Sequence, residues 1–349
     1  MAENAYVDEP IQVLPWPAAI RKRPGMYVGP LDDGAGFETM LHAVIDELLD
    51  VGSDASYLRL TVDGAAIGVE HDGRSFEPAE IVDRFANAQM HGMHRWGVPV
   101  TCALSSQLDV DAWHEGRVYS QRFVRGHRVG PMHLADGAVR RRTFVRFTPD
   151  ITVLPPHTWH ATALEQLARE LAAMYPHMTL LLDDVTIRYP DGVADHLRHV
   201  TRDDHTTPII EAQGRVQDVD VELAMTWRES GPLRIDGLVN RRRSIDGAHV
   251  TGLRDGVKDA IAARVGTTLP ADALERGLVA CVAVQLDTAR FRGWQRLDLQ
   301  NREAYDAVRE LVVETLARDQ HVDVLDTLLA RCSAQRGITN KKSRGGTKR

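Results

Sequence analysis

The sequence predicts an α+β fold in two domains, and three features support this prediction. The chain has 349 residues, of which 43% are hydrophobic and 26% are charged. Such a chain is too long for one ordinary core and too apolar to stay disordered. Helical and strand patterns also occur in runs and not in strict strand–helix–strand alternation, which favours an α+β sandwich over a doubly wound parallel sheet.

The first half of the chain is expected to hold one long helix and several strands. Apolar residues recur at helical spacing over residues 36–51, which predicts an amphipathic helix. The alternating stretch that follows contains Asp63 and Gly64, a pair typical of the turn in a two-strand hairpin. Further strands are expected at residues 118–124 and 143–147, then a helix at 161–174 and a strand at 179–189.

A polar segment separates this half from the next. Residues 196–208 are rich in His, Arg, Asp and Thr, which indicates a boundary between domains. We expect strands at 219–227, 233–240 and 277–287, and helices at 249–265 and 302–318.

The charge balance limits the kind of nucleic-acid contact that is possible. A formal net charge of −7 argues against a protein that coats DNA over its whole surface, because phosphate binding depends on concentrated Lys and Arg. A run of Lys and Arg does occur between residues 341 and 349. We expect a solvated, disordered tail there, and a weak contact with DNA or a partner protein is the alternative.

The cysteines and the N-terminus indicate a cytoplasmic protein. Cys102, Cys281 and Cys332 lie far apart and show no pairing or metal-binding spacing, so free thiols in a reducing compartment are expected. The N-terminus lacks the basic and apolar regions of a secretion signal. No apolar run approaches the roughly 20 residues that span a bilayer.

Several strings resemble, in the same order, the B subunits of bacterial DNA gyrase and other type IIA topoisomerases. The most characteristic is RKRPGMYVG, which ends at Gly29. The likeness covers about residues 5–333 and implies a GHKL (Bergerat) α/β sandwich ATPase-like domain followed by a transducer domain of ribosomal-S5-like α/β fold. The other strings are residues 36–52, 71–74, 143–150, 246–257 and 274–286. The implied parts are an arm at 1–13, the ATPase-like domain at 14–200, the transducer at 201–333 and a basic tail at 334–349.

The resemblance implies an ATP and Mg²⁺ site, but the catalytic positions differ. In the family a Glu of the first helix activates water and an Asn four residues later holds Mg²⁺. Ala43 and Glu47 stand at these positions, so the general base is missing. The residue that orients the base corresponds to Thr39. Glu47 offers carboxylate oxygens to a metal, although an exposed helix carboxylate is the simpler interpretation. Asp50 lies on the same helix face.

The nucleoside-binding turn is altered at its first residue. His71 takes the place of the family's adenine-reading Asp, and histidine accepts a hydrogen bond only through an unprotonated ring nitrogen. Asp72, Gly73 and Arg74 match the rest of the family's turn. Thr143 matches a family residue near the adenine.

The family's long glycine-rich lid over the phosphates is reduced here. After one short helix expected within residues 79–89, Gly92 and Gly97 match the ends of the lid motif. Arg95 replaces its middle glycine and Trp96 follows, and neither side chain allows the glycine backbone geometries that cradle phosphate.

Two more positions follow from the resemblance. Arg296 aligns with the transducer lysine that reaches the terminal phosphate, and it keeps the charge but not the geometry. Tyr6 lies where the family's N-terminal arm reaches into its dimer partner, which implies a homodimer; an ordinary disordered terminus is the alternative.

Two groups of histidines are candidates for a metal site. His91 and His94 flank the lid remnant, and His196, His199 and His205 lie in the polar segment. Neither group has Cys or carboxylate ligands at a familiar zinc spacing, so solvated polar loops are expected.

Three functional hypotheses remain open at this stage. The first is a regulatory pseudo-ATPase that associates with gyrase subunits or its own copy. The second is an auxiliary subunit that binds ATP and hydrolyses it slowly. The third is a folded product with no maintained activity. Topoisomerase activity by this chain alone is not expected, because the sequence ends before the family's cleavage domain.

Overall fold

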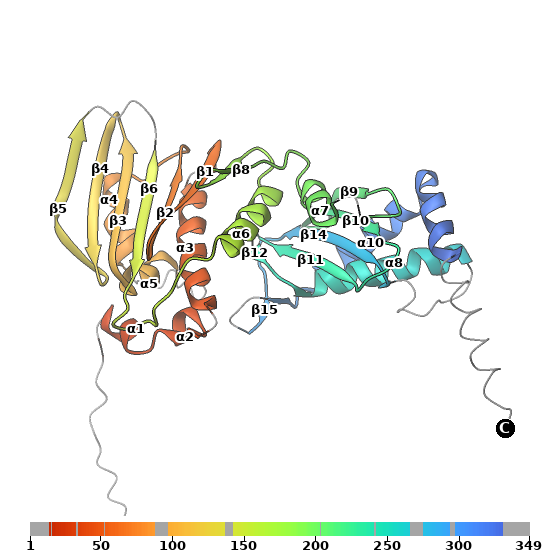
Figure 1. Ribbon diagram of the computed structural model, residues 1–349, viewed down its shortest axis with the longest axis horizontal. Coiled ribbons are helices and arrows are strands. Elements are labelled where there is room, and N and C mark those ends of the chain that lie inside the picture. Colours follow the sequence, from red (N-terminus) through yellow and green to blue (C-terminus); the bar gives the residue numbers. More distant parts are fainter. Residues whose placement is uncertain are drawn as a thin grey trace, which may run out of the picture. The chain divides into compact units, whose positions relative to one another are not determined.

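The computed structural model divides the chain into two units (Figure 1). The first comprises residues 1–164 and 181–186, and the second comprises residues 165–180 and 187–349. The domain boundary near residue 200 stays a prediction. The structure describes residues 14, 16–32, 34–51, 53–87, 97–136, 142–202, 204–240, 242–265, 275–293 and 297–330.

The first unit is built on a sheet with the strand order β5-β4-β3-β6-β2-β1-β7-β8. Neighbouring strands from β5 to β1 pair antiparallel. The predicted hairpin at Asp63 and Gly64 is present, since β1 and β2 pair in register on either side of it. The strands are β1 (Tyr57–Asp63), β2 (Ala66–His71), β3 (Ser105–His114), β4 (Arg117–Val124), β5 (His127–Asp136), β6 (Thr143–Pro149), β7 (Thr179–Leu182) and β8 (Val185–Ile187).

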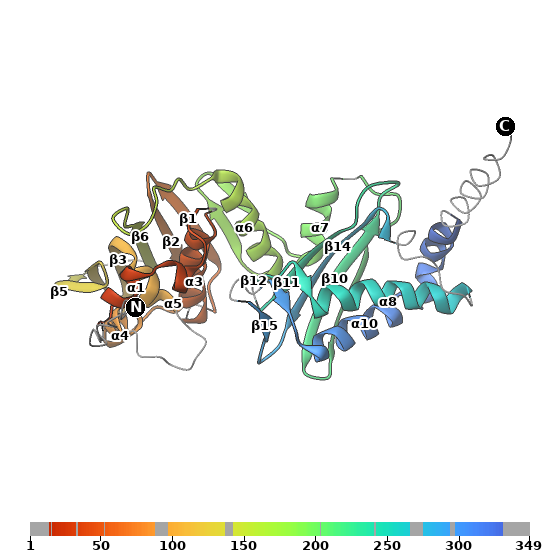
Figure 2. The same ribbon diagram turned by 90° about the horizontal axis from the view of Figure 1, so that it is seen from below.

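Helices cover one face of this sheet, as Figure 2 shows for α3, α4 and α5. Helix α3 (Ala35–Val51) is the predicted amphipathic helix, and the large apolar residues of its buried face are at most 1% exposed: Met40, Leu41, Val44, Ile45, Leu48 and Leu49. The sheet residues that alternate toward these helices, such as Leu60, Val69 and Val145, are fully buried. The other helices of this unit are α1 (Ala18–Lys22), α2 (Gly25–Val28), α4 (Pro78–Ala86) and α5 (Gly97–Ala103).

A buried ion pair fastens the N-terminal segment to the end of β6. Asp150 is 2% exposed, and Arg21 and Arg125 donate to its Oδ2 at 2.7 and 2.9 Å. Arg21 also donates to the carbonyl of Ala103. Burial acts to raise the pKa of Asp150, but hydrogen bonds from Thr152 and Arg21 outweigh it and lower the pKa to about 2. The string RKRPGMYVG therefore has a structural role through Arg21.

The second unit holds a five-stranded sheet and a small three-stranded one. The larger sheet has the order β12-β11-β14-β10-β9, and β14 pairs parallel with β11 but antiparallel with β10. The small sheet has the order β13-β16-β15. The strands are β9 (Ile210–Val216), β10 (Val219–Trp227), β11 (Arg234–Val239), β12 (Arg242–Arg243), β13 (Asp246–Gly247), β14 (Leu278–Gln285), β15 (Phe291–Arg292) and β16 (Asp298–Leu299).

Helices α8 (Ala248–Val265) and α10 (Arg302–Leu316) form the main core with one face of the larger sheet. The two helices approach closely through glycines: a Cβ on Gly252 would lie 2.5 Å from the Tyr305 carbonyl, and one on Gly256 would lie 2.8 Å from Val312. Helix α7 (Val193–Thr201) contacts β10 and β14. A short 3₁₀ helix, Asp319–His321, follows α10.

Two expectations about local structure were wrong. Residues 179–189 form two strands, because Asp183 adopts a positive φ of 45° and turns the chain between β7 and β8. The polar segment at 196–208 begins inside helix α7, whose apolar face is buried. His196 is accordingly not in a solvated loop: it is 5% exposed, and its Nε2 lies 3.1 Å from Asp236 Oδ2.

The cysteines and the helix lengths are reported for the described residues only. Cys102 and Cys281 are free and buried, while Cys332 lies outside that part of the chain. None of the helices described combines the length and apolar composition that a membrane crossing requires.

Helix α6 (Ala161–Met174) was predicted with these bounds, and its residues fall in both units. Its buried face includes Leu164, Leu171 and Ala172. The amphipathic spacing was sufficient to place it.

Candidate nucleotide site

The first helix of the candidate site presents its carboxylate to an arginine. Glu47 of α3 accepts a short hydrogen bond from Nη1 of Arg84, which lies on α4. Arg84 also donates through Nη2 to Glu80 at 3.3 Å. The side chains of Glu47 and Arg84 are 19% and 30% exposed, so solvent screens this pair only partly. Ala43 is half-buried on the same helix, and Asp50 is exposed.

The local sequence holds Arg84 in place. Helix α4 begins with a capping box in which the side chains of Glu77 and Glu80 each accept a backbone N–H at the helix start, and Pro78 occupies the first turn. One turn later, the guanidinium carbon of Arg84 lies 5.6 Å from the centre of the Phe76 ring. The position of the guanidinium is therefore set by helix α4, by the Phe76 ring and by the carboxylates of Glu47 and Glu80.

The electrostatics keep Arg84 charged. Burial acts to lower the pKa of its guanidinium, but the hydrogen bond and charge of Glu47, together with Glu80, outweigh it and raise the pKa. Arg84 is thus a permanent cation that neutralises Glu47.

The turn after β2 places His71 in the core. His71 is fully buried, and it stands directly opposite Thr143 in the pairing of β2 with β6. Nδ1 of His71 accepts the backbone N–H of Gly73 at 3.1 Å. An accepting Nδ1 carries no proton, so the neutral ring has its proton on Nε2. The Thr143 hydroxyl is fully buried and has no hydrogen-bond partner among the described residues.

Asp72 and Arg74, which match the family's turn, form hydrogen bonds that involve backbone groups. Asp72 accepts hydrogen bonds from the backbone N–H groups of Ser56 and Tyr57 at 2.8 and 3.2 Å. Burial acts to raise the pKa of Asp72, but a hydrogen bond from the Ser56 hydroxyl and these two backbone hydrogen bonds together lower it. The backbone N–H of Arg74 donates to Asp54. Asp72 and Arg74 therefore tie the turn to the residues around the start of β1.

Aromatic side chains fill the space behind the Arg84–Glu47 pair. Phe76, which lies just after the turn, is fully buried. Its ring centre lies 5.5 Å from the Phe85 ring, and the Phe85 ring lies 6.1 Å from the Phe123 ring. Phe76 therefore packs into the core of the first unit.

The remaining sequence candidates are only partly described. Gly97 begins α5 with a positive φ of 35°, a conformation that suits glycine. Gly92, Arg95, Trp96, Arg296 and Tyr6 lie outside the described residues. His91 and His94 do as well.

The structure groups the candidates into two separate pairs and one turn. Glu47 accepts a hydrogen bond from Arg84, His71 stands opposite Thr143 in the sheet, and Asp72 accepts backbone hydrogen bonds in the turn. Arg84 was missed from the sequence. Its spacing from Glu80 indicates a pair along one helix, but nothing local indicates contact with Glu47, which is 37 residues away.

Metal binding finds little support in this part of the chain. No group of three or more His, Cys, Asp or Glu side chains within the described residues is placed to hold a metal ion. Oε1 of Glu47 accepts from Arg84, so a cation at this carboxylate would compete with the guanidinium.

Sequence comparison relates the chain to B subunits of type II topoisomerases. A family model described as DNA gyrase B matches residues 192–345. The DNA gyrase B subunit of Thermotoga maritima is 23% identical over 99% of this chain and 61% of its own length. The B subunit of the type 2 topoisomerase of Aquifex aeolicus is 26% identical over 93% of this chain and 46% of its own length. The chain thus spans about half the length of these relatives.

Solved structures show the same fold. The 43K ATPase domain of Thermus thermophilus gyrase B, solved with an aminocoumarin, superposes with a TM-score of 0.77 at 21% identity and covers 95% of this chain and 98% of its own. The gyrase B subunit of Myxococcus xanthus gives 0.76 at 25% identity, over 90% and 99% of the two chains. The sandwich and transducer architecture predicted from the sequence is therefore confirmed.

Proposed function

We propose that this divergent relative of the gyrase B and type IIA topoisomerase B subunits is a pseudo-ATPase, an ATPase–transducer module that acts in the cytoplasm as a binding or regulatory protein linked to DNA topology. The observation that carries the proposal is the ion pair between Arg84 and Glu47. It puts a fixed side-chain cation where the family uses an exchangeable metal ion.

A fixed guanidinium does not substitute for Mg²⁺ in this chemistry. Mg²⁺ binds several phosphate and protein oxygens at once and exchanges with each nucleotide. Arg84 instead donates through Nη1 to Glu47 and through Nη2 to Glu80, and a guanidinium cannot bridge phosphate and carboxylate oxygens as a metal ion does. Ala43, at the position of the water-activating Glu, offers no group that accepts a proton. Both losses act on hydrolysis, since each removes a separate part of the transition-state stabilisation.

The second candidate is an auxiliary subunit that binds nucleotide and hydrolyses it slowly. The preserved turn at Asp72, Gly73 and Arg74 favours it. So does the buried Thr143 hydroxyl, which lacks a hydrogen-bond partner among described residues and stands opposite His71. A buried polar atom of this kind is costly unless a ligand or a water satisfies it.

One experiment separates the two candidates. The full chain is titrated with ATP and Mg²⁺ by calorimetry, and phosphate release is followed over hours, with an active gyrase B ATPase domain as the positive control. The pseudo-ATPase proposal expects phosphate release equal to the protein-free blank. Micromolar ATP affinity together with phosphate release above the blank would defeat it and support the second candidate.

The regulatory part of the proposal concerns partners. The family resemblance implies gyrase subunits or a second copy of this chain, and contact with DNA only through the basic residues 341–349. Light scattering measures self-association, and pull-down with purified gyrase A and B subunits measures the hetero-complex. A monomer that retains neither of them would contradict a regulatory role at gyrase.

A further inference from the structure

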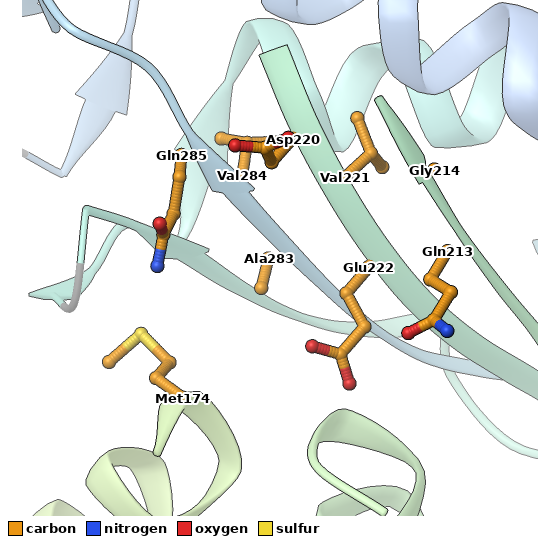
Figure 3. A pocket seen from close by; sticks show the side chains of 9 residues that line it. All are labelled: Met174, Gln213, Gly214, Asp220, Val221, Glu222, Ala283, Val284 and Gln285. Atoms are coloured by element: carbon orange, nitrogen blue, oxygen red, sulfur yellow. The ribbon is translucent and has the colours of Figure 1, made fainter. Parts of the chain in front are cut away.

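A hollow of about 540 Å³ lies on the larger sheet of the second unit (Figure 3). Its floor comes from β9, β10 and β14, and Met174, at the end of α6, forms part of its wall. All its lining residues belong to the second unit. None of them is a candidate residue of the nucleotide site. Its volume falls within the range of ordinary small-molecule sites.

Glu222 stands at the centre of this hollow. It lies on the middle strand, opposite Gln213 of β9 and Ala283 of β14. The carboxylate reaches the start of α7, where Oε1 accepts the backbone N–H of Val193 at 3.1 Å. Gly192 makes room for this contact, because a Cβ there would lie 2.2 Å from Oε1. One oxygen of Glu222 is therefore engaged and the side chain is fixed.

Among the described residues, no side-chain cation pairs with Glu222. Burial raises the pKa of this carboxyl, the Val193 hydrogen bond opposes the rise, and the nearby charge of Glu211 adds to it. In the described part of the chain no cation contributes to the pKa of Glu222. The neighbouring arginines are committed elsewhere: Arg198 pairs with Glu211, and Arg215 pairs with Asp220.

The rest of the wall is part apolar and part polar. Met174 and Ala283 contribute a thioether and a methyl group to the lining (Figure 3). The side-chain amides of Gln213 and Gln285 stand at the exposed rim. The hollow therefore combines two carboxylates, Glu222 and the Asp220 that pairs with Arg215, with a short apolar path.

We propose that this hollow binds a small aliphatic amine, whose ammonium group pairs with Oε2 of Glu222 and whose alkyl chain lies along Met174 and Ala283. An ammonium is a point charge that needs only one carboxylate oxygen. A guanidinium prefers both oxygens of a carboxylate, and Val193 already occupies one of them. An anionic ligand is excluded by the unbalanced charge of Glu222.

The same chemistry exists in two sources, a free amine and a lysine side chain. The probes are therefore 1-aminobutane, Nα-acetyl-lysine amide and, as an uncharged control of similar shape, 1-butanol. Each is titrated into the full chain at neutral pH while methyl and amide chemical shifts around Met174 and Ala283 are recorded by NMR. The proposal expects saturable binding of 1-aminobutane, no saturable binding of 1-butanol, and weaker binding of the larger lysine amide.

Variants identify the group that is responsible. Glu222→Gln keeps an acceptor for Val193 but removes the charge, and it should weaken 1-aminobutane binding by about tenfold or more. Asp220→Asn, the matched control on the same face, should change it less than twofold because Arg215 already pairs with Asp220. If Glu222→Gln fails to fold, Ala283→Leu provides the test instead. Its larger side chain fills the floor of the hollow and should abolish 1-aminobutane binding.

Either of two results would overturn the proposal. The first is that the chain binds 1-aminobutane and 1-butanol with equal affinity, and the second is that the affinity for 1-aminobutane is unchanged in both Glu222→Gln and Ala283→Leu. Tighter binding of the lysine amide than of 1-aminobutane would refute the free amine as the ligand.

Discussion

Replacing Asp150 by Asn tests whether the buried ion pair at the end of β6 stabilises the first unit. Asp150 is 2% exposed and accepts from Arg21, Arg125 and Thr152. These contacts hold its pKa at about 2 against a usual value of 3.8. That difference corresponds to about 2.5 kcal/mol of stability at neutral pH, and Asp150→Asn should remove about this amount.

The pH dependence has a definite sign. Because the pKa of Asp150 is lowered in the folded state, its stabilisation is fully present above pH 3.8 and is lost as the pH falls toward 2. Unfolding by urea, followed by tryptophan fluorescence at pH 7 and at steps between pH 4 and 2, measures both effects. Between pH 4 and 2, the free energy of unfolding of Asp150→Asn should therefore fall less than that of the wild type.

A matched control exists on the same sheet. Asp63 also pairs with an arginine, Arg146, but its side chain is 72% exposed, so Asp63→Asn should cost less than about 1 kcal/mol. If Asp150→Asn were no more destabilising at pH 7 than Asp63→Asn, the reasoning about the buried pair would be refuted.

Three further predictions concern other parts of the chain. Arg84→Ala releases Glu47, so Mn²⁺ should bind weakly to the variant but not to the wild type, as measured by water-proton relaxation; equal relaxation would contradict the role given to the ion pair. Gly256→Ala forces a Cβ to 2.8 Å from a valine of α10 and should destabilise the second unit by about 1–3 kcal/mol in urea, whereas Thr251→Ala, exposed on the same helix, should have little effect. Burial lowers the pKa of His249 to about 4, so stability should be lost as the pH falls from 6.5 to 4, by up to about 3 kcal/mol, and His249→Gln should remove this loss; an unchanged pH profile in the variant would rule His249 out as its cause.

The fold was largely predictable because its strongest patterns are local. Helix α3 and the β1–β2 hairpin each carry their signal within fewer than twenty residues, as helical spacing or as a turn pair. Helix α7 was missed because the polarity of residues 196–208 was given more weight than the buried positions of its first two turns. Polar residues on one face of a short helix do not prevent its other face from packing.

The contacts of the candidate site were not predictable from the sequence. The resemblance assigned functional positions to Glu47 and His71, and this assignment stays a prediction. The sequence did not indicate that Arg84 pairs with Glu47, or that His71 accepts from Gly73. Both contacts depend on how separate segments meet, and side-chain chemistry alone does not specify that.

The strand order of the second unit has a consequence for biosynthesis. Strand β14 lies between β11 and β10, although it is the last of the five in the sequence. A nascent chain that ends before residue 278 holds two separate strand pairs, β9 with β10 and β11 with β12, and nothing yet joins them into one sheet. Strand β14 therefore leaves the ribosome after the two strand pairs that it joins. Until β14 is made, the unpaired edges of β10 and β11 are open to wrong pairing.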